Sequence, residues 1–216
     1  MIRFLVVAKA PHPGRVKTRL GAAVGQVAAA EVAAAALLDT LAACRAMSGV
    51  EQCHLALAGD LSGAARESDL RDALAGWTVR RQRGAGLAVR LAHAHADLGP
   101  GPVVQLGMDT PQVDGARLRS VAERLATHEA VLGPAVDGGW WSLALRDPAR
   151  ARVLRSVPMS LPTTGRDTRA ALQSAGLDVA EAAVLRDVDT AADADLVAAE
   201  IPDSDFARAW RGVLVR

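Results

Sequence analysis

The sequence predicts a single α/β domain with a mainly parallel sheet and helices on both faces. Short apolar runs of strand length alternate with longer helical patterns along the chain. These runs are uniformly apolar, as is typical of strands buried on both faces. The 216 residues suffice for one sizeable core, and no Gly/Ser-rich linker divides them, so we expect one domain over 1–216.

The individual elements follow from the length and spacing of the apolar residues. Strands are expected over residues 2–8, 54–58, 77–80, 103–106, 130–132, 140–145 and 179–185. Helices are expected over residues 24–47, 64–74, 86–98, 116–126, 149–155, 168–175, 193–200 and 205–213. The first of these helices is rich in alanine, which loses no side-chain entropy when a helix forms.

Composition excludes several classes of function. Half of the residues are hydrophobic, which argues against disorder, and a net charge of +1 provides no general attraction for nucleic acid or a membrane surface. The chain has no Tyr, two Phe and four Trp, too few aromatic rings for stacking many bases. Cys44 and Cys53 are expected as buried thiols, because two cysteines make neither a disulfide framework nor a metal site.

The apolar segment at the start of the chain is too short for a signal peptide or a membrane span, and Pro11 and Pro13 follow it directly. We therefore expect a cytoplasmic protein. The C-terminal segment from Phe206 to Arg216 could pack on its own subunit or on a neighbouring one, which leaves a homo-oligomer open.

The most informative motif is Gly107-Met108-Asp109-Thr110-Pro111, directly after the apolar run 102–106. A buried strand delivers Asp109 to its C-terminal end, which is the edge where open α/β sheets bind ligands. A single Asp there can hold a divalent cation against substrate phosphates. The alternative is that Asp109 caps the following turn.

A basic loop follows the first expected strand. It contains neither a Walker A motif nor a dinucleotide fingerprint. It places Lys9, Gly14, Arg15, Lys17 and Arg19 at the C-terminal edge of the sheet, where cations and backbone N–H groups suit a diphosphate or triphosphate. The alternative is a solvated basic loop, although its two prolines restrict its shape.

A second glycine-containing segment precedes the helix expected at 86–98. We include Gly84 and Arg90 among the candidate phosphate-binding residues, although a plain turn before a helix explains Gly84 and Gly86 equally well. His93 and His95 are two residues apart on this helix and face different directions, so we interpret them as structural or exposed.

The segment Asp137-Gly138-Gly139-Trp140-Trp141 joins two expected strands. Consecutive strand residues face opposite sides of a sheet, so one Trp can enter the core while the other borders the cleft. The glycines permit close approach of the backbone to a ligand. The alternative is a hairpin-like turn with tryptophans in the core.

Two acids, Asp187 and Asp189, follow the last expected strand, and Thr190 can cap the next helix. One of these acids could share a metal with Asp109, and we name Asp189; capping is the alternative. The polar loop 158–168, with Thr164, is suited to a lid or to contact with an acceptor.

Taken together, these motifs resemble the bacterial DUF2064 group, whose members are described as glycosyltransferases of GT-A fold in the nucleotide-diphospho-sugar transferase superfamily. The resemblance rests on Lys-x-Pro-x-Pro-Gly-x-Val-Lys-Thr-Arg-Leu, Gly-x-Asp-x-Pro, Gly-Pro-Ala-x-Asp-Gly-Gly, Thr-Gly-x-x-Thr and Asp-Val-Asp-Thr, and spans residues 4–196. Two positions depart from the family pattern: Met108 replaces an expected small polar residue and Ala88 an expected glycine.

The resemblance implies that Lys17 and Arg19 contact phosphates and that Asp109 binds Mg²⁺ or Mn²⁺. It also implies that Asp137 and the Gly138-Gly139 turn line the acceptor side, to which we add Trp140 and Thr164. The Lys-x-Arg-Leu spacing at 17–20 is also similar to that of phospholactate guanylyltransferase.

We therefore expect a metal-dependent transferase that moves a sugar from a nucleotide sugar to a small-molecule acceptor, with Asp137 as general base. One alternative is a guanylyltransferase-like nucleotidyltransferase that releases pyrophosphate. Another is a non-catalytic module that binds a nucleotide.

Overall fold

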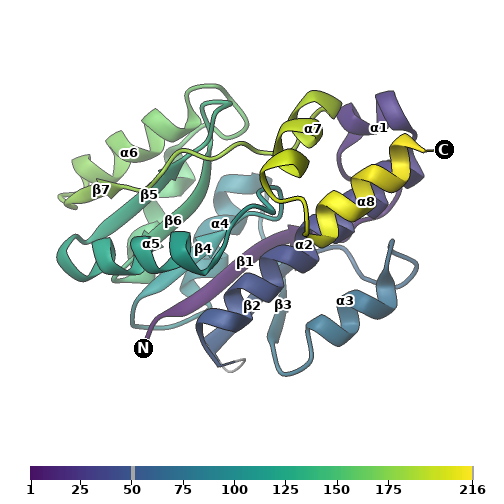
Figure 1. Cartoon of the computed structure of the whole chain (residues 1–216). Coiled ribbons are helices and arrows are strands. Elements are labelled where there is room, and N and C mark those ends of the chain that lie inside the picture. Colours follow the sequence, from purple (N-terminus) through teal and green to yellow (C-terminus); the bar gives the residue numbers. More distant parts are fainter. Residues whose placement is uncertain (50–51, 216) are drawn as a thin grey trace.

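The computed structural model describes residues 1–49 and 52–215 (Figure 1). In this part of the chain a seven-stranded sheet has the order β3-β2-β1-β4-β6-β5-β7. The strands are β1 (Arg3–Lys9), β2 (Cys53–Ala58), β3 (Thr78–Arg81), β4 (Val103–Leu106), β5 (Ala130–Pro134), β6 (Trp140–Leu145) and β7 (Val179–Glu181). Only β6 runs antiparallel to its neighbours, β4 and β5. The predicted mainly parallel α/β sheet is therefore confirmed.

Helices cover both faces of the sheet, as predicted. One face packs against α2 (Gln26–Met47), α3 (Glu67–Ala73) and α5 (Gly115–Thr127). The other packs against α4 (Gly86–Ala96), the 3₁₀ helix η2 (Pro148–Ser156) and α6 (Thr164–Ser174). A third cluster joins α1 (Thr18–Val24), α7 (Ala191–Glu200) and α8 (Asp205–Leu214) to α2.

The long helix α2 forms the centre of this arrangement, with the sheet on one side and α8 beside it (Figure 1). Its length and its mean hydropathy of 1.7 would suffice to cross a bilayer, but 67% of the apolar window is buried inside the fold. Packing on two sides explains why so many of its positions are apolar. Asp39 on α2 accepts hydrogen bonds from the backbone N–H groups of Asp205 and Phe206 at the start of α8.

Four elements differ from the sequence-based prediction. One is α6, which begins at Thr164, inside the loop expected over residues 158–168. The loop expected before residue 24 contains the short helix α1, which ends at Gly25 with a φ of 88°. The segment 148–156 is a 3₁₀ helix begun by Asp147, whose side chain accepts from Ala149 N. The last strand ends at Glu181, and Leu185 makes only an isolated bridge with Ala135.

The strand order places a topological switch point between β1 and β4. From β1 the chain adds β2 and then β3 on one side, whereas β4 pairs with the other side of β1. Ligands of open α/β sheets bind outside the carboxyl ends of strands at such a point. The basic loop after β1 and the Asp109 loop after β4 face each other there.

Candidate functional site

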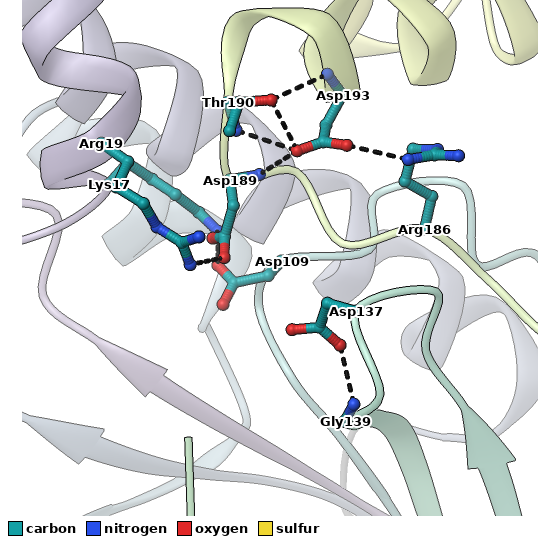
Figure 2. A network of polar contacts seen from close by, with 9 residues as sticks. All are labelled: Lys17, Arg19, Asp109, Asp137, Gly139, Arg186, Asp189, Thr190 and Asp193. Atoms are coloured by element: carbon teal, nitrogen blue, oxygen red, sulfur yellow. Dashed lines mark hydrogen bonds and ion pairs between the residues drawn. The ribbon is translucent and has the colours of Figure 1, made fainter. Parts of the chain in front are cut away.

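Lys17 is the central cation of the loop after β1. Its ammonium lies 2.7 Å from Oδ1 of Asp109 and 2.9 Å from Oδ1 of Asp189, and only 6% of its side chain is exposed (Figure 2). Burial lowers the pKa of Lys17, but the two carboxylates outweigh burial and raise its pKa above the ordinary value. Lys17 is therefore a fixed positive charge between two acids.

The backbone of Lys17 is left-handed, with φ and ψ both 46°. A non-glycine residue in this conformation costs on the order of 1 kcal/mol. The preceding turn is held by Arg15 N donating to His12 O, and His12 Nε2 lies 2.8 Å from the carbonyl oxygen of Asp60. The loop thus turns the Lys17 side chain inward at a conformational cost.

Asp189 is held by two cations, because Arg19 also forms an ion pair with it. The segment around Asp189 is fixed by a capping box at the start of α7. Thr190 accepts from Asp193 N, and Asp193 accepts from Thr190 N. Arg186 Nη1 lies 3.0 Å from Asp193 Oδ1 (Figure 2). The predicted cap at Thr190 is confirmed, and Asp189 itself remains directed at the basic loop.

Asp187 contributes a further carboxylate that the sequence analysis treated only as one of two strand-end acids. Burial, followed by the charges of Asp109 and Asp137, raises its pKa to about 7. The neighbouring Val188 N donates to Asp109 O, which ties this segment to the loop after β4. The sequence signal for a role of Asp187 in the site was its two-residue spacing from Asp189, because residues i and i+2 of an extended segment share a face.

Two adjoining cavities surround these residues. The smaller, of about 250 Å³, is lined mainly by the basic loop 15–19. The larger, of about 610 Å³, extends from β1 and α4 to Trp140 and the loop after η2. Both are lined by Lys9, Arg19, Met108, Asp109 and Asp189, so the acids and the cations lie where the cavities meet.

Most of the predicted site residues line one of the two cavities. They are Lys9, Arg15, Lys17, Arg19, Arg90, Asp109, Asp137, Gly139, Trp140, Thr164 and Asp189. Gly14, Gly84 and Gly138 line neither of them. The carbonyl oxygen of Gly84 instead accepts from Arg90 Nε at 3.2 Å, and the Cα of Gly14 faces open space.

The two tryptophans separate as predicted. Trp141 is 1% exposed and belongs to the core on the α2 face, where its indole N–H donates to Ala183 O. Trp140 faces the larger cavity, and its indole N–H donates to Thr168 Oγ1 at 3.2 Å.

The Gly138-Gly139 turn is closely covered by residues 158–164, which we call the strap. A Cβ at Gly138 would overlap the carbonyl oxygen of Pro162, and Gly165 N donates to Gly138 O. Within the strap, Thr164 Oγ1 donates to Pro158 O and accepts from Leu161 N. The strap and the turn together form one wall of the larger cavity.

The acids fit a divalent cation in part. Among residues 1–49 and 52–215, no three His, Cys, Asp or Glu side chains are arranged as a preformed metal shell. The charges of Asp109 and Asp137 nevertheless disfavour the ionised form of Asp187, so a cation would relieve repulsion there. Mg²⁺ needs only one or two carboxylates when water and substrate phosphates complete its shell.

Solved structures share this architecture. A protein of Desulfovibrio desulfuricans G20, provisionally assigned as a nucleotide-diphospho-sugar transferase, is 26% identical with a TM-score of 0.82, covering 99% of this chain and 93% of its own. Rv0371c of Mycobacterium tuberculosis H37Rv, in a complex with manganese, is 22% identical with a TM-score of 0.56, and the match covers 91% and 97% of the two chains. CMP:2-keto-3-deoxy-manno-octonic acid synthetase, complexed with CTP, is 12% identical with a TM-score of 0.56 and coverage of 93% and 98%.

The fold is thus the Rossmann-like α/β fold found in nucleotidyl- and sugar-transferring proteins. The chain belongs to the bacterial family DUF2064, described as "Uncharacterized protein conserved in bacteria", whose pattern matches residues 40–161. The family resemblance predicted from the motifs is confirmed. No curated protein matches the sequence significantly.

Proposed function

We propose that this chain is a metal-dependent transferase acting on a nucleotide-activated donor, and that it transfers a sugar from a nucleotide sugar to a small acceptor. The supporting observation is the meeting of the two cavities at Asp109, with Lys9 and Arg19 on the same walls. A diphosphate placed there would lie beside these cations and beside Asp109, which would hold a divalent metal.

Asp109 and Asp187 are the pair that we propose for Mg²⁺ or Mn²⁺. Asp189, the second ligand inferred from the sequence, is paired with two cations, Lys17 and Arg19, whereas Asp109 is paired with Lys17. A metal bound here would stabilise the charge that develops on the leaving diphosphate. Rv0371c, which shares the fold, has been crystallised with manganese, and this supports the use of a divalent metal.

The cations of the basic loop would bind the phosphates. Lys9 and Arg15 are exposed and make no ion pair with any residue that the structure describes, so both are available to a ligand. Arg19 can turn from Asp189 toward a phosphate, because 71% of its side chain is exposed. Fixed charges of this kind supply electrostatic stabilisation, which is commonly the largest catalytic contribution.

The acceptor would occupy the larger cavity between Trp140 and the strap. An indole face offers a stacking surface for a sugar ring, and Asp137 lines the same cavity as the candidate general base. A volume of about 610 Å³ is in the range of cavities that bind small molecules. Space beyond the phosphate region favours transfer to a second substrate.

Nucleotidyl transfer is the second candidate. The observation in its favour is the smaller cavity, whose lining includes Lys9, Arg15, Lys17 and Arg19, enough cations for a triphosphate. In nucleotidyl transfer the second substrate would attack the α-phosphorus of the triphosphate and release pyrophosphate. Glycosyl transfer would instead release a nucleoside diphosphate. The identity of the released product therefore separates the two candidates.

The test is calorimetric titration of nucleoside triphosphates and nucleotide sugars, with Mn²⁺ or EDTA, into the wild-type protein and Asp109→Asn. Asp72→Asn is the matched control, because Asp72 is an exposed acid on α3 outside both cavities. We expect metal-dependent binding of a nucleotide sugar that Asp109→Asn loses and Asp72→Asn retains. Binding of triphosphates alone would favour nucleotidyl transfer, and the absence of any nucleotide binding would refute both candidates.

A further inference from the structure

A buried pair of polar side chains lies at the α4 side of the larger cavity. Gln105 on β4 is 2% exposed and lines the cavity, and His95 on α4 is fully buried behind it. His95 Nε2 lies 2.7 Å from Gln105 Oε1. Polar groups at such depth are costly, so their arrangement requires a physical reason.

The contact fixes the orientation of the Gln105 amide. An amide oxygen can only accept, so His95 donates from a protonated Nε2. Burial lowers the pKa of His95 to about 4, which keeps the ring neutral near pH 7. Its Nδ1 is buried without a partner among the described residues, a cost that an apolar side chain would avoid.

The amide nitrogen of Gln105 is the free end of this pair. Its oxygen is occupied by His95, and no acceptor for its Nε2 occurs among the hydrogen bonds of residues 1–49 and 52–215. Because Gln105 lines the larger cavity, Nε2 presents a neutral donor there.

Gln82, after β3, presents the complementary group. Its Nε2 donates to Ala8 O and to Ala56 O, both at 2.9 Å, which uses both amide hydrogens and leaves Oε1 as an acceptor. Gln82 lines the same cavity as Gln105, and the side chains of Val7, Leu87 and Leu91 line it with them. This end of the cavity therefore combines one neutral donor, one neutral acceptor and apolar walls.

We propose that Gln105 and Gln82 bind the base of the nucleotide, with Gln105 donating to a carbonyl or ring nitrogen and Gln82 accepting from an N–H of the base. This inference rests on the proposed function. A planar heterocycle presents both kinds of group on its edges and apolar faces to leucine side chains. Phosphates would select the cations at the other end of the cavity. His95 is a positioning residue that acts through Gln105.

The experiment compares two ligands in calorimetric titrations with Mg²⁺. The first is the nucleoside diphosphate that the wild type binds best, and the second is inorganic tripolyphosphate, which lacks a base. Gln105→Leu should raise the Kd of the nucleotide about tenfold or more and leave that of tripolyphosphate unchanged, because the phosphate end is intact. Gln173→Leu, an exposed glutamine on α6, is the matched control and should change neither.

His95→Leu tests the positioning role through the ratio of the two dissociation constants. Loss of the contact lets the Gln105 amide rotate, so the nucleotide Kd should rise while the tripolyphosphate Kd stays the same. General structural damage would instead weaken both ligands together. If Gln105→Leu does not fold, Gln82→Met provides the same comparison at the acceptor.

The outcomes distinguish a failure of the base-binding inference from a failure of the proposed function. If the wild type binds both ligands and Gln105→Leu binds the nucleotide equally well, the base-binding role is refuted while the proposed function stands. If the wild type binds neither ligand, both fail.

Discussion

The Nζ atom of Lys17 lies 2.7 Å from Oδ1 of Asp109, which joins the loop after β1 to the loop after β4 across the switch point of the sheet (Figure 2). The same ammonium reaches Asp189, so three chain segments share one charge. Phosphates and a divalent cation would compete for these partners: the cation for Asp109 and the phosphates for Lys17. A metal and phosphates that bind here would therefore have to replace these ion pairs with contacts of their own.

Lys17→Met should destabilise the protein, because Asp109 and Asp189 lose a buried counter-charge. Both carboxylates retain some contact with water, so we expect the free energy of unfolding to fall by about 1–3 kcal/mol rather than more. Urea unfolding at pH 8 measures this. Lys9→Met is the control, since Lys9 is exposed and should change stability by less than about 0.5 kcal/mol. Equal stability of the two variants would contradict the structural role of Lys17.

Asp187 should make stability depend on pH. Its pKa is about 7 in the folded protein and 3.8 is the ordinary value, so between these limits the folded state binds more protons than the unfolded state. The contribution of Asp187 to stability therefore decreases as the pH rises from about 4 to 7. Asp187→Asn removes this contribution, and the melting temperature of the variant relative to wild type should increase by a few degrees between pH 5 and pH 8.

Thermal melts at both pH values, without metal, give this difference directly. Asp72→Asn provides the baseline for an exposed acid. A difference for Asp187→Asn that is the same at pH 5 and pH 8 would show that the carboxyl titrates normally. With Mn²⁺ present, the wild type should gain stability and Asp187→Asn should gain less.

Gly138 should be intolerant of a side chain because of the strap. Its φ is +87°, and an added Cβ would overlap the carbonyl oxygen of Pro162. Gly14 has a similar φ of +75° with open space around it, so Gly14→Ala isolates the backbone cost, about 1 kcal/mol. We expect Gly138→Ala to lose at least about 2 kcal/mol in urea unfolding. Equal losses of unfolding free energy in Gly138→Ala and Gly14→Ala would mean that the strap moves aside at no cost.

The sequence could predict the sheet and the edge that carries the site, because these depend on local patterns. Apolar runs marked most of the strands, and motifs such as the one at Asp109 marked their carboxyl ends. The separation of Trp140 from Trp141 was also predictable, since neighbouring strand residues face opposite sides.

Contacts between distant segments were not predictable in this way. The partners of Lys17 lie in loops far along the chain, and its left-handed backbone begins α1 without a recognisable cap residue. Gly138 is covered by Pro162. The sequence analysis interpreted the glycines as room for a ligand, but at Gly138 that room is occupied by another segment of the same chain. His95 carried no motif; it and Gln105 lie in consecutive elements, but their contact depends on how α4 lies against the sheet.

Asp137 offers a way to separate a chemical role from a structural one. Its Oδ1 accepts from Gly139 N at 2.8 Å, so the carboxyl shapes the turn as well as facing the larger cavity. Asp137→Asn keeps an oxygen that can accept this hydrogen bond but cannot take a proton from an acceptor hydroxyl. Asp137→Ala loses both capacities.

If Asp137 is the general base of glycosyl transfer, Asp137→Asn should retain the melting temperature and the donor affinity of the wild type. Its turnover should fall by about 100-fold or more, which is the usual contribution of a general base. Asp137→Ala should show the same loss of turnover together with a lower melting temperature, because the turn loses a hydrogen bond worth about 1 kcal/mol. Release of nucleoside diphosphate from the donor measures turnover. Normal turnover in Asp137→Asn, with a defect only in Asp137→Ala, would assign Asp137 to the turn and leave the base to another group in the cavity.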